Sequence, residues 1–318
     1  MIQANGLTKA YGDTIAVDDL SFEVRPGVVT GFLGPNGAGK STTMRLMLEL
    51  DHGGGEALFD GRRFSDIRHP MREVGTVLEA KAFHPKRSAR NHLRMLAAAN
   101  RISTRRVDEV LAMVGLADVA RKSPGGFSFG MGQRLGLAAA LLGDPGTLIL
   151  DEPSNGLDPH GIQWLRDLLK KLAAEGRTIF VSSHLLAEMA LMADDLVVIG
   201  RGRLISAGPA ADFIRDFTRS SVVVRSPDSD VLVKAVLETL PAVEVSTAAD
   251  GSVRFGGVEA ATVGEVAARV GAVLHELTSS TASLEEAFLQ ATGASEEYVG
   301  TVLPASSSVA PAESGGPA

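Results

Sequence analysis

The sequence predicts an α/β fold with a mixed sheet and an α-helical insertion, followed by a small α+β domain. Short apolar runs alternate with helical stretches up to about residue 215, the strand signal is lost over 87–142, and short strands return after residue 218. The chain has 318 residues, 45% of them hydrophobic, which is enough for a buried core. We expect domains and a tail at residues 1–217, 218–293 and 294–318.

Apolar runs mark the strand candidates of the first domain. They span residues 21–24, 28–34, 74–79, 147–152, 178–183 and 195–200. Several of these runs are apolar on both faces, which is typical of central strands covered by helices on each side. The segments NHLRMLAAAN and RRVDEVLAMVGL have helical spacing, and we assign them to an insertion at about 87–142.

The second domain is predicted from short runs after residue 218. SSVVVRS, VEVS and SVRFGG have the composition of strands, and VLVKAVLETL and TVGEVAARVGAVL have the spacing of helices. The segment LEEAFLQATG closes the ordered part of the chain and is assigned to this domain. From residue 294 onward, the Ala, Ser, Pro, Gly and Glu composition leaves little to bury, so we expect a disordered tail.

Composition excludes several classes of site. The chain has no cysteine, which excludes disulfide scaffolds, thiolate zinc sites and cysteine nucleophiles and favours a reducing compartment. The N-terminal residues lack the basic stretch and apolar core of a signal peptide. The longest apolar run, residues 135–143, is shorter than the ~20 residues of a membrane-spanning helix. We therefore expect a soluble polypeptide that meets a membrane only through a partner.

The net charge of −7 is unevenly distributed along the chain. Residues 1–217 carry 26 basic and 25 acidic side chains, whereas residues 218–318 carry 5 and 13. The asymmetry supports a boundary near residue 217 and argues against nucleic acid wrapping around the C-terminal part. We expect no nucleic acid among the partners. Residues 81–107 hold eight basic side chains and no acidic one. Such a run is either a solvated helical face or a docking surface for a partner or for anionic headgroups.

The segment GPNGAGKS at residues 34–41 fits the phosphate-loop pattern G-x-x-x-x-G-K-[ST], between a predicted strand and a predicted helix. Its glycines let successive backbone N–H groups turn toward an anion, and the helix N-terminus adds partial positive charge. Lys40 is placed to reach the β- and γ-phosphates, and Ser41 to ligate Mg²⁺. The nucleotide-binding candidates in this loop are Gly34, Pro35, Asn36, Gly37, Ala38, Gly39, Lys40, Ser41 and Thr42.

The segment TLILDEP at residues 147–153 is an apolar strand that ends in two carboxylates. Asp151, at the strand tip, suits Mg²⁺ directly or through water, and the adjacent Glu152 is placed to polarise the attacking water. Two acids after a strand are also common as a helix N-cap. Their combination with a phosphate loop favours the catalytic interpretation.

The segment FSFGMGQR at residues 127–134 resembles the signature of the nucleotide-binding subunits of ABC transporters, usually written L-S-G-G-Q. The resemblance covers about residues 2–215 and implies a P-loop NTPase fold of the ABC type. Ser128 and Gly130 match, whereas the phenylalanines on either side of Ser128 and the methionine after Gly130 depart from the most frequent letters. In the family this segment contacts the γ-phosphate held by the opposite subunit, which implies that role for Ser128 and Gly130.

Three further residues match the family by position. The segment NGLD at residues 155–158 resembles the loop that links the two ATP sites across a dimer, which implies a role for Asp158 at the nucleotide. His184, directly after the strand candidate 178–183, resembles the switch histidine that contacts the γ-phosphate and holds the attacking water. Tyr11 resembles the aromatic residue that stacks on adenine.

The sequence departs from the family at Glu79, where a glutamine usually touches Mg²⁺ and relays the nucleotide state to the membrane subunit. A glutamate oxygen can still ligate Mg²⁺, and its charge near Glu152 should shift the electrostatics of the site. Our hypothesis is that Glu79 serves as a magnesium or coupling residue. The candidate metal ligands are Ser41, Glu79 and Asp151.

The resemblance implies an ATPase in which two copies of the chain sandwich ATP and Mg²⁺. Each copy would supply the phosphate loop, the carboxylates and His184 to one nucleotide, and its signature segment to the other. The motion would pass to polytopic permease subunits through the insertion and the Glu79 loop. This arrangement places the protein in the cytoplasm, peripherally attached to the cell membrane through its permease.

The small second domain and the ending SLEEAFLQATG resemble ATPases of drug- and antibiotic-resistance exporters, including the daunorubicin-resistance type. Sugar importers usually have a larger, β-rich C-terminal domain, so we favour an exporter of drug-like or other hydrophobic compounds. One alternative is a soluble ABC ATPase acting on ribosomes or DNA, which the single phosphate loop and short insertion oppose. Another is a pseudo-ATPase, which Glu79 permits but the intact Lys40, Asp151, Glu152 and His184 oppose.

Overall fold

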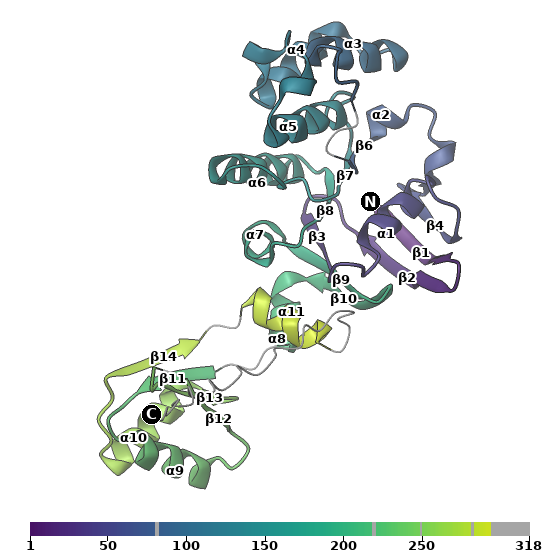
Figure 1. Cartoon of the computed structure of the whole chain (residues 1–318). Helices are drawn as coiled ribbons and strands as arrows, with labels where there is room; N and C mark the ends of the chain where they lie inside the picture. Colours follow the sequence, from purple (N-terminus) through teal and green to yellow (C-terminus); the bar gives the residue numbers. More distant parts are fainter. Residues whose placement is uncertain (80–82, 218–220, 249, 281–282, 294–318) are drawn as a thin grey trace, which may run out of the picture.

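The computed structural model in Figure 1 describes residues 1–79, 83–217, 221–248, 250–280 and 283–293. The tail expected at 294–318 lies outside these described residues. Within the described part of the chain, no helix is both long and apolar enough to cross a membrane.

A six-stranded sheet in the order β10-β9-β3-β8-β7-β6 forms the centre of the first domain. Its strands are β3 (Val29–Leu33), β6 (Val74–Val77), β7 (Thr147–Leu150), β8 (Thr178–Ser182), β9 (Asp195–Gly200) and β10 (Arg203–Pro209). All pairs are parallel except β10 with β9, so the sheet is mixed. Every residue of β3, β7, β8 and β9 is buried, which confirms the expectation of central strands covered on both faces.

An antiparallel sheet in the order β2-β1-β4-β5 packs against the central sheet. Its strands are β1 (Ile2–Tyr11), β2 (Thr14–Val24), β4 (Gly54–Phe59) and β5 (Arg62–Arg63). Together with α1 (Lys40–Met47), it encloses a core in which the ring of Phe180 lies 5.5 Å from that of Phe22 and 4.9 Å from that of Phe32, measured between centroids. The sequence predicted only residues 21–24 of this sheet, because bulges in β1 interrupt the alternation of apolar and polar residues.

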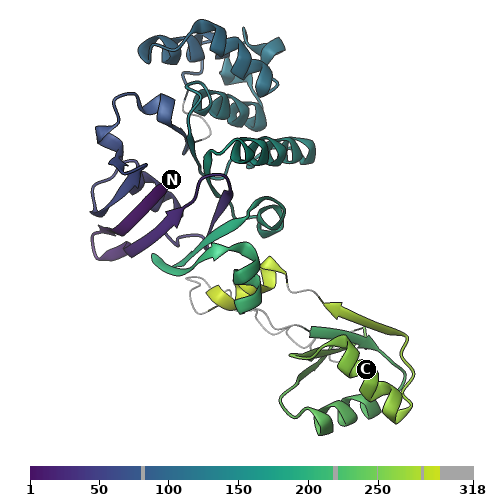
Figure 2. The same ribbon diagram turned by 180° about the vertical axis from the view of Figure 1, so that it is seen from behind.

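Helices form the remainder of the first domain (Figures 1 and 2). Those before β7 are α2 (Pro70–Glu73), α3 (Ala89–Ala99), α4 (Thr104–Met113) and α5 (Phe129–Ala140), with 3₁₀ turns η1 (Phe64–Asp66), η2 (Ala117–Val119) and η3 (Pro124–Gly126). Those after β7 are α6 (Pro159–Ala174), α7 (Leu186–Met192) and α8 (Ala210–Phe217). Residues 87–142 contain helices and no strand, which agrees with a helical insertion.

The second domain is a separate lobe at the end of the molecule opposite to α3 and α4 (Figures 1 and 2). Its elements are β11 (Ser221–Arg225), α9 (Ser229–Thr239), β12 (Glu244–Thr247), β13 (Val253–Gly256), α10 (Ala260–Val270) and β14 (Glu276–Ser280). The strands form an antiparallel sheet in the order β12-β13-β11-β14. Val222 and Phe255 on the sheet pack with Val236 of α9 and Val263 of α10 in a core of their own.

The last helix, α11 (Leu284–Thr292), differs from the expectation in where it packs. The sequence assigned it to the second domain, but its buried side chains Leu284, Ala287 and Phe288 belong to the core of the first domain, with Phe213 of α8. Ser283 and Glu286 start the helix with a capping box. The chain therefore leaves the first domain after α8, builds the second domain and returns.

This packing predicts that Phe288→Ala lowers the free energy of unfolding of the first domain by about 3 kcal/mol, because a buried aromatic ring leaves a cavity. Urea unfolding followed by fluorescence of Trp164, the one tryptophan of the chain and part of α6, measures the first domain directly. The control is Leu289→Ala, because the Leu289 side chain is 54% exposed. An unchanged Trp164 transition in the Phe288 variant would place α11 outside this core.

Candidate nucleotide-binding and catalytic site

The phosphate loop connects the end of β3 to the start of α1, and its glycines are required by close packing. A Cβ atom on Gly34 would lie 2.8 Å from the carbonyl oxygen of Ile199, and one on Gly39 would lie 2.3 Å from that of Ala16. Gly39 also has a φ of +100°, which favours glycine. The loop is thus held against β9 and its neighbours at a distance that side chains would not permit.

Lys40, the first residue of α1, is folded back over this loop. Its ammonium donates to the carbonyl oxygens of Gly34 at 2.5 Å and Pro35 at 3.1 Å, and the residue is only 9% exposed. Burial lowers the pKa of Lys40, and the negative charges of Glu152 and Asp151 partly oppose this shift. Lys40 therefore lies within the electrostatic field of the predicted catalytic residue Glu152 and of the predicted magnesium ligand Asp151, although it comes from another part of the chain.

Asp151 follows β7 and is held by two hydroxyl groups. Ser41, in the first turn of α1, donates to its Oδ2 at 2.6 Å, and Ser182, at the end of β8, donates to its Oδ1 at 2.5 Å. The backbone N–H of Asp151 donates to the carbonyl oxygen of Val77 at 2.7 Å. The structure thus brings Ser41 and Asp151 together, as predicted.

Glu152 takes a different set of contacts from the adjacent Asp151. Its Oε2 lies 2.7 Å from Nδ1 of His184, so the predicted catalytic pair is also in contact. Its backbone N–H donates to the hydroxyl of Ser182 at 2.9 Å, and Nε2 of Gln133 donates to its carbonyl oxygen at 3.3 Å. Ser182 and Gln133 were not predicted as site residues from the sequence. The signal for Ser182 was its position at the end of the strand next to β7.

The signature segment and the loop after Asp151 are packed against each other. Ser128 caps α5 by accepting from the backbone N–H of Met131 at 3.2 Å, and Asp158 caps α6 in the same way. A Cβ atom on Gly130 would lie 2.6 Å from the carbonyl oxygen of Gly156, and one on Gly156 would lie 2.0 Å from the Phe129 ring. The Phe129 side chain therefore occupies the space over Gly156, and the two segments are in close contact.

Tyr11 and Glu79 lie outside the contacts that join Lys40, Asp151 and Glu152. The Tyr11 ring, at the end of β1, is 51% exposed, and its hydroxyl donates to Asp51 at 3.1 Å. Glu79 follows β6, and its charge adds to the effect of the Asp51 hydrogen bond in raising the pKa of Arg45. Within the described residues, no hydrogen bond links Glu79 to Ser41 or Asp151.

Comparison with known proteins decides the family. A family model described as ABC transporter matches residues 17–155, and one described as a domain of unknown function (DUF8746) matches residues 220–285. The uncharacterized ABC transporter ATP-binding protein YhcH of Bacillus subtilis (strain 168) is 36% identical over 310 residues, 94% of this chain and 98% of YhcH. This chain belongs to the ABC transporter ATP-binding proteins.

Two further ABC proteins support this assignment. The bacitracin transport ATP-binding protein BcrA of Enterococcus faecalis is 35% identical over 303 residues, 92% of this chain and 96% of BcrA. The ATP-binding cassette MJ0796, solved as a post-hydrolysis dimer with ADP and Pi, is 25% identical with a TM-score of 0.60, and covers 66% of this chain and 98% of that one. The predicted fold class and family resemblance are confirmed. The chain is an ATP-hydrolysing subunit of an ABC transporter, and none of these comparisons supports an ATPase of ribosomes or DNA.

The Ser182 hydroxyl contacts both Asp151 and Glu152, and this arrangement can be tested by substitution. Ser182→Ala should lower kcat roughly tenfold while ATP binding persists, because one hydrogen bond to the Asp151 carboxylate and one from the Glu152 backbone are lost together. Steady-state phosphate release and nucleotide binding measure the two effects. Thr178→Val, a nearly isosteric change at the buried opposite end of the same strand, is the control. An equal effect of both substitutions would show that Ser182 acts only through the fold.

The contact between Phe129 and Gly156 generates a second prediction. Gly156→Ala should lower ATPase activity more than tenfold, and the same change in a Phe129→Ala background should cost much less, because the ring that meets the new methyl group is gone. Gly176→Ala is the matched control, because Gly176 has a φ of +92° but nothing within 4 Å of its Cβ position. Purely additive losses in the double-mutant cycle would contradict the packing of these two segments.

Proposed function

We propose that two copies of this chain sandwich two ATP molecules and thereby drive export of an antibiotic-like compound through a membrane permease. The catalytic part of this proposal rests on one observation, which is that two adjacent carboxylates have different contacts. Asp151 accepts from the hydroxyls of Ser41 and Ser182, whereas the Glu152 side chain is in contact with the imidazole of His184. The Asp151 carboxylate thus contacts two hydroxyl groups, whereas the Glu152 carboxylate contacts an imidazole ring.

The residues around Asp151 fit a magnesium ion. The Ser41 hydroxyl and the Asp151 carboxylate are oxygen donors 2.6 Å apart, and Mg²⁺ binds through such oxygens together with substrate phosphates and water. The described residues contain no group of three or more His, Asp or Glu side chains that could hold a metal without a substrate. When bound with ATP, Mg²⁺ would neutralise charge on the β- and γ-phosphate oxygens.

We assign the binding of the phosphates and the activation of water to the chain's own groups. The turned backbone and Lys40 are in place to receive the phosphates, since the Lys40 ammonium already lies against the loop carbonyls that it would leave for phosphate oxygens. Glu152 is the proposed base that takes a proton from the attacking water. His184 is the proposed partner that fixes the Glu152 carboxylate and reaches the γ-phosphate. Tyr11 is proposed to stack on adenine.

The second half of the site is proposed to come from another copy. Ser128 is exposed at the N-terminus of α5, and Gly130 and Asp158 flank the close contact between the signature segment and the loop at 155–158. Among the described residues, no hydrogen bond joins Ser128 or Asp158 to the phosphate loop at 34–41 of the same chain. The dimeric structure of MJ0796 with ADP and Pi supports the pairing of two cassettes.

The permease is proposed to dock in a groove between the central sheet and the insertion. This groove has a volume of about 330 Å³, and its lining includes Arg45, Glu79, Phe83, His92 and Leu96. It lies at the end of β6, whose Val77 carbonyl accepts from the backbone N–H of Asp151. Movement at Asp151 would therefore reach the groove through a single hydrogen bond. We retain Glu79 as the coupling residue of this groove and as a candidate magnesium ligand.

The type of transport is inferred from the relatives. BcrA is named for bacitracin transport and SrtF of Streptococcus pyogenes for lantibiotic transport, and BcrA is similar along almost the whole chain, including the second domain. We infer that this chain powers export of a peptide antibiotic or a comparable amphipathic compound. It would work in the cytoplasm, at the inner face of the membrane.

The sandwich predicts that Glu152→Gln abolishes ATP turnover and produces an ATP-bound dimer, because phosphate contacts form but water is no longer deprotonated. Light scattering coupled to gel filtration, with ATP and Mg²⁺, measures the mass. Glu265→Gln, the same change at an exposed position of α10, should remain active and follow the wild-type mass. A monomeric Glu152 variant with bound ATP would contradict the sandwich.

A further inference from the structure

The helical insertion carries exposed cations that the proposed mechanism does not use. They gather where the start of α3 runs beside the chain after η2: the Ala89 N–H donates to the Lys122 carbonyl at 3.1 Å, and the Arg90 N–H donates to that of Ala120 at 2.8 Å. We call this cluster the basic face. Its members, all exposed or half-exposed, are Lys86, Arg87, Arg90, Arg94, Arg121 and Lys122.

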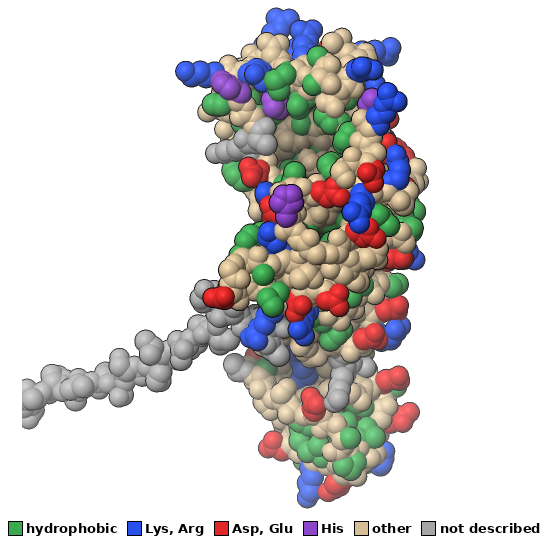
Figure 3. Space-filling model, turned by 90° about the vertical axis from the view of Figure 1, so that its right-hand side faces the viewer, with side chains coloured by type: hydrophobic (Ala, Val, Ile, Leu, Met, Phe, Trp, Pro, Cys, Tyr) green, Lys and Arg blue, Asp and Glu red, His purple; other side chains and the backbone are tan. Residues whose placement is uncertain are grey.

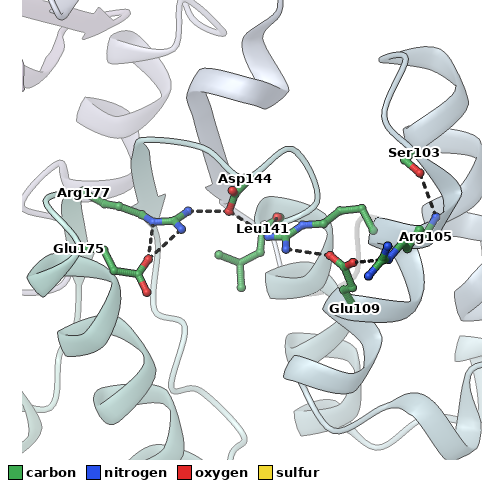
Figure 4. Close-up of polar contacts among 8 residues, drawn as sticks. Ser103, Arg105, Glu109, Leu141, Asp144, Glu175 and Arg177 are labelled. Carbon is green, nitrogen blue, oxygen red and sulfur yellow. Dashed lines mark hydrogen bonds and ion pairs between the residues drawn. The ribbon is translucent and has the colours of Figure 1, made fainter.

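The structure divides the basic run of residues 81–107 into two parts. In the later part, Arg105 pairs with Glu109, and Arg106 pairs with both Glu109 and Asp144. Figure 4 shows this network, which Asp144 extends to Arg177, the residue directly before β8. These charges are neutralised, and they join the insertion to the rest of the first domain.

The basic face is not neutralised in this way. Among the described residues, Arg90 is its one member with an ion pair, to Asp108 at 2.7 Å. The other five have no described carboxylate within 4.0 Å, and Asp118 is the remaining acidic residue of the insertion's tip. Arg90 and Arg94 are one helical turn apart, where like charges repel. The cluster therefore works against the stability of the isolated chain, and an anionic surface would relieve the repulsion.

The distribution of charge over the whole molecule points to a large, flat anionic partner. Figure 3 shows Lys and Arg side chains gathered over the insertion, at the end opposite to the second domain. Residues 218–318 have the reverse balance, with 5 basic and 13 acidic side chains. A planar anionic surface would thus attract one end of the molecule and repel the other, which fixes its orientation.

The position of α3 relates the basic face to the groove. Helix α3 contributes His92 and Leu96 to the groove wall, and it carries Arg90 and Arg94 of the basic face along the same two turns. A permease segment seated in the groove would bring this helix near the surrounding lipid. We propose that the basic face binds anionic phospholipid headgroups beside the permease, through charge attraction that acts within ~8 Å at physiological salt. Its placement beside the permease rests on the proposed function, whereas the binding itself does not.

Sedimentation of the full-length chain with phospholipid vesicles tests the proposal. The chain should bind vesicles that contain 30% phosphatidylglycerol and not vesicles of pure phosphatidylcholine, and 0.5 M salt should release it. Replacing Lys86, Arg94, Arg121 and Lys122 by Ala should weaken binding on the order of 100-fold. The matched control replaces two lysines and two arginines at exposed positions elsewhere by Ala; these are Arg68, Lys170, Lys171 and Arg269.

Several results would overturn the proposal. These are equal binding to both kinds of vesicle, equal weakening by the control set, and binding to single-stranded RNA that matches or exceeds binding to the anionic vesicles. ATP turnover of the quadruple variant should stay within twofold of the wild type, because none of its four positions contacts the phosphate loop or the carboxylates. Retained ATPase activity and a normal Glu152→Gln dimer alongside absent lipid binding would refute the basic face alone. A failed dimer with intact lipid binding would refute the sandwich alone.

Discussion

The carboxylate of Asp151 is the point at which the functional parts of this ABC ATPase meet. This carboxylate accepts hydrogen bonds from the hydroxyls of Ser41 at the start of α1 and Ser182 at the end of β8. The backbone N–H of Asp151 donates to the carbonyl oxygen of Val77 at the end of β6. These groups come together only because β6, β7 and β8 are adjacent and parallel, so that their carboxyl ends lie at one edge of the sheet. The order and register of the central sheet therefore determine whether the phosphate loop, the acid pair and the groove can act on one another.

The geometry of Glu152 shows how the surroundings enforce this arrangement. The residue has a φ of +48°, a left-handed conformation that costs a non-glycine residue on the order of 1 kcal/mol or more. Both of its backbone polar groups are occupied, by the Ser182 hydroxyl and the Gln133 amide. The turn aims the Glu152 side chain at His184 while Asp151, one residue earlier, points toward Ser41. Strain at one residue thus separates the directions of two adjacent carboxylates.

The sequence was sufficient to predict site residues where a short motif determines its own geometry. It was insufficient where the position of a residue depends on how distant segments pack. The phosphate loop, the acid pair and His184 were predictable because each follows a strongly apolar strand, and ends of parallel strands converge. The position of Ser182 at the end of an apolar strand was insufficient as a signal, because its role depends on the pairing of β8 with β7. The return of α11 to the first domain was hidden for the same reason, because its apolar face would fit either core. The role of Glu79 beside Arg45 depends on side-chain placement that spacing does not encode.

The basic run shows that the neutralisation of charges likewise depends on distant parts of the chain. In the sequence, residues 81–107 are a uniform block of cations, yet their neutralisation depends on acids elsewhere in the chain: Asp144, which is not part of the block, binds both Arg106 and Arg177. These ion pairs anchor the insertion to the edge of the sheet, whereas among the described residues of the basic face Arg90 alone has an ion pair, with Asp108. Attraction between the basic face and a membrane consequently acts on an insertion that ion pairs already hold to the rest of the first domain. Membrane attraction and ATP chemistry can then reside in one domain without sharing a charged residue.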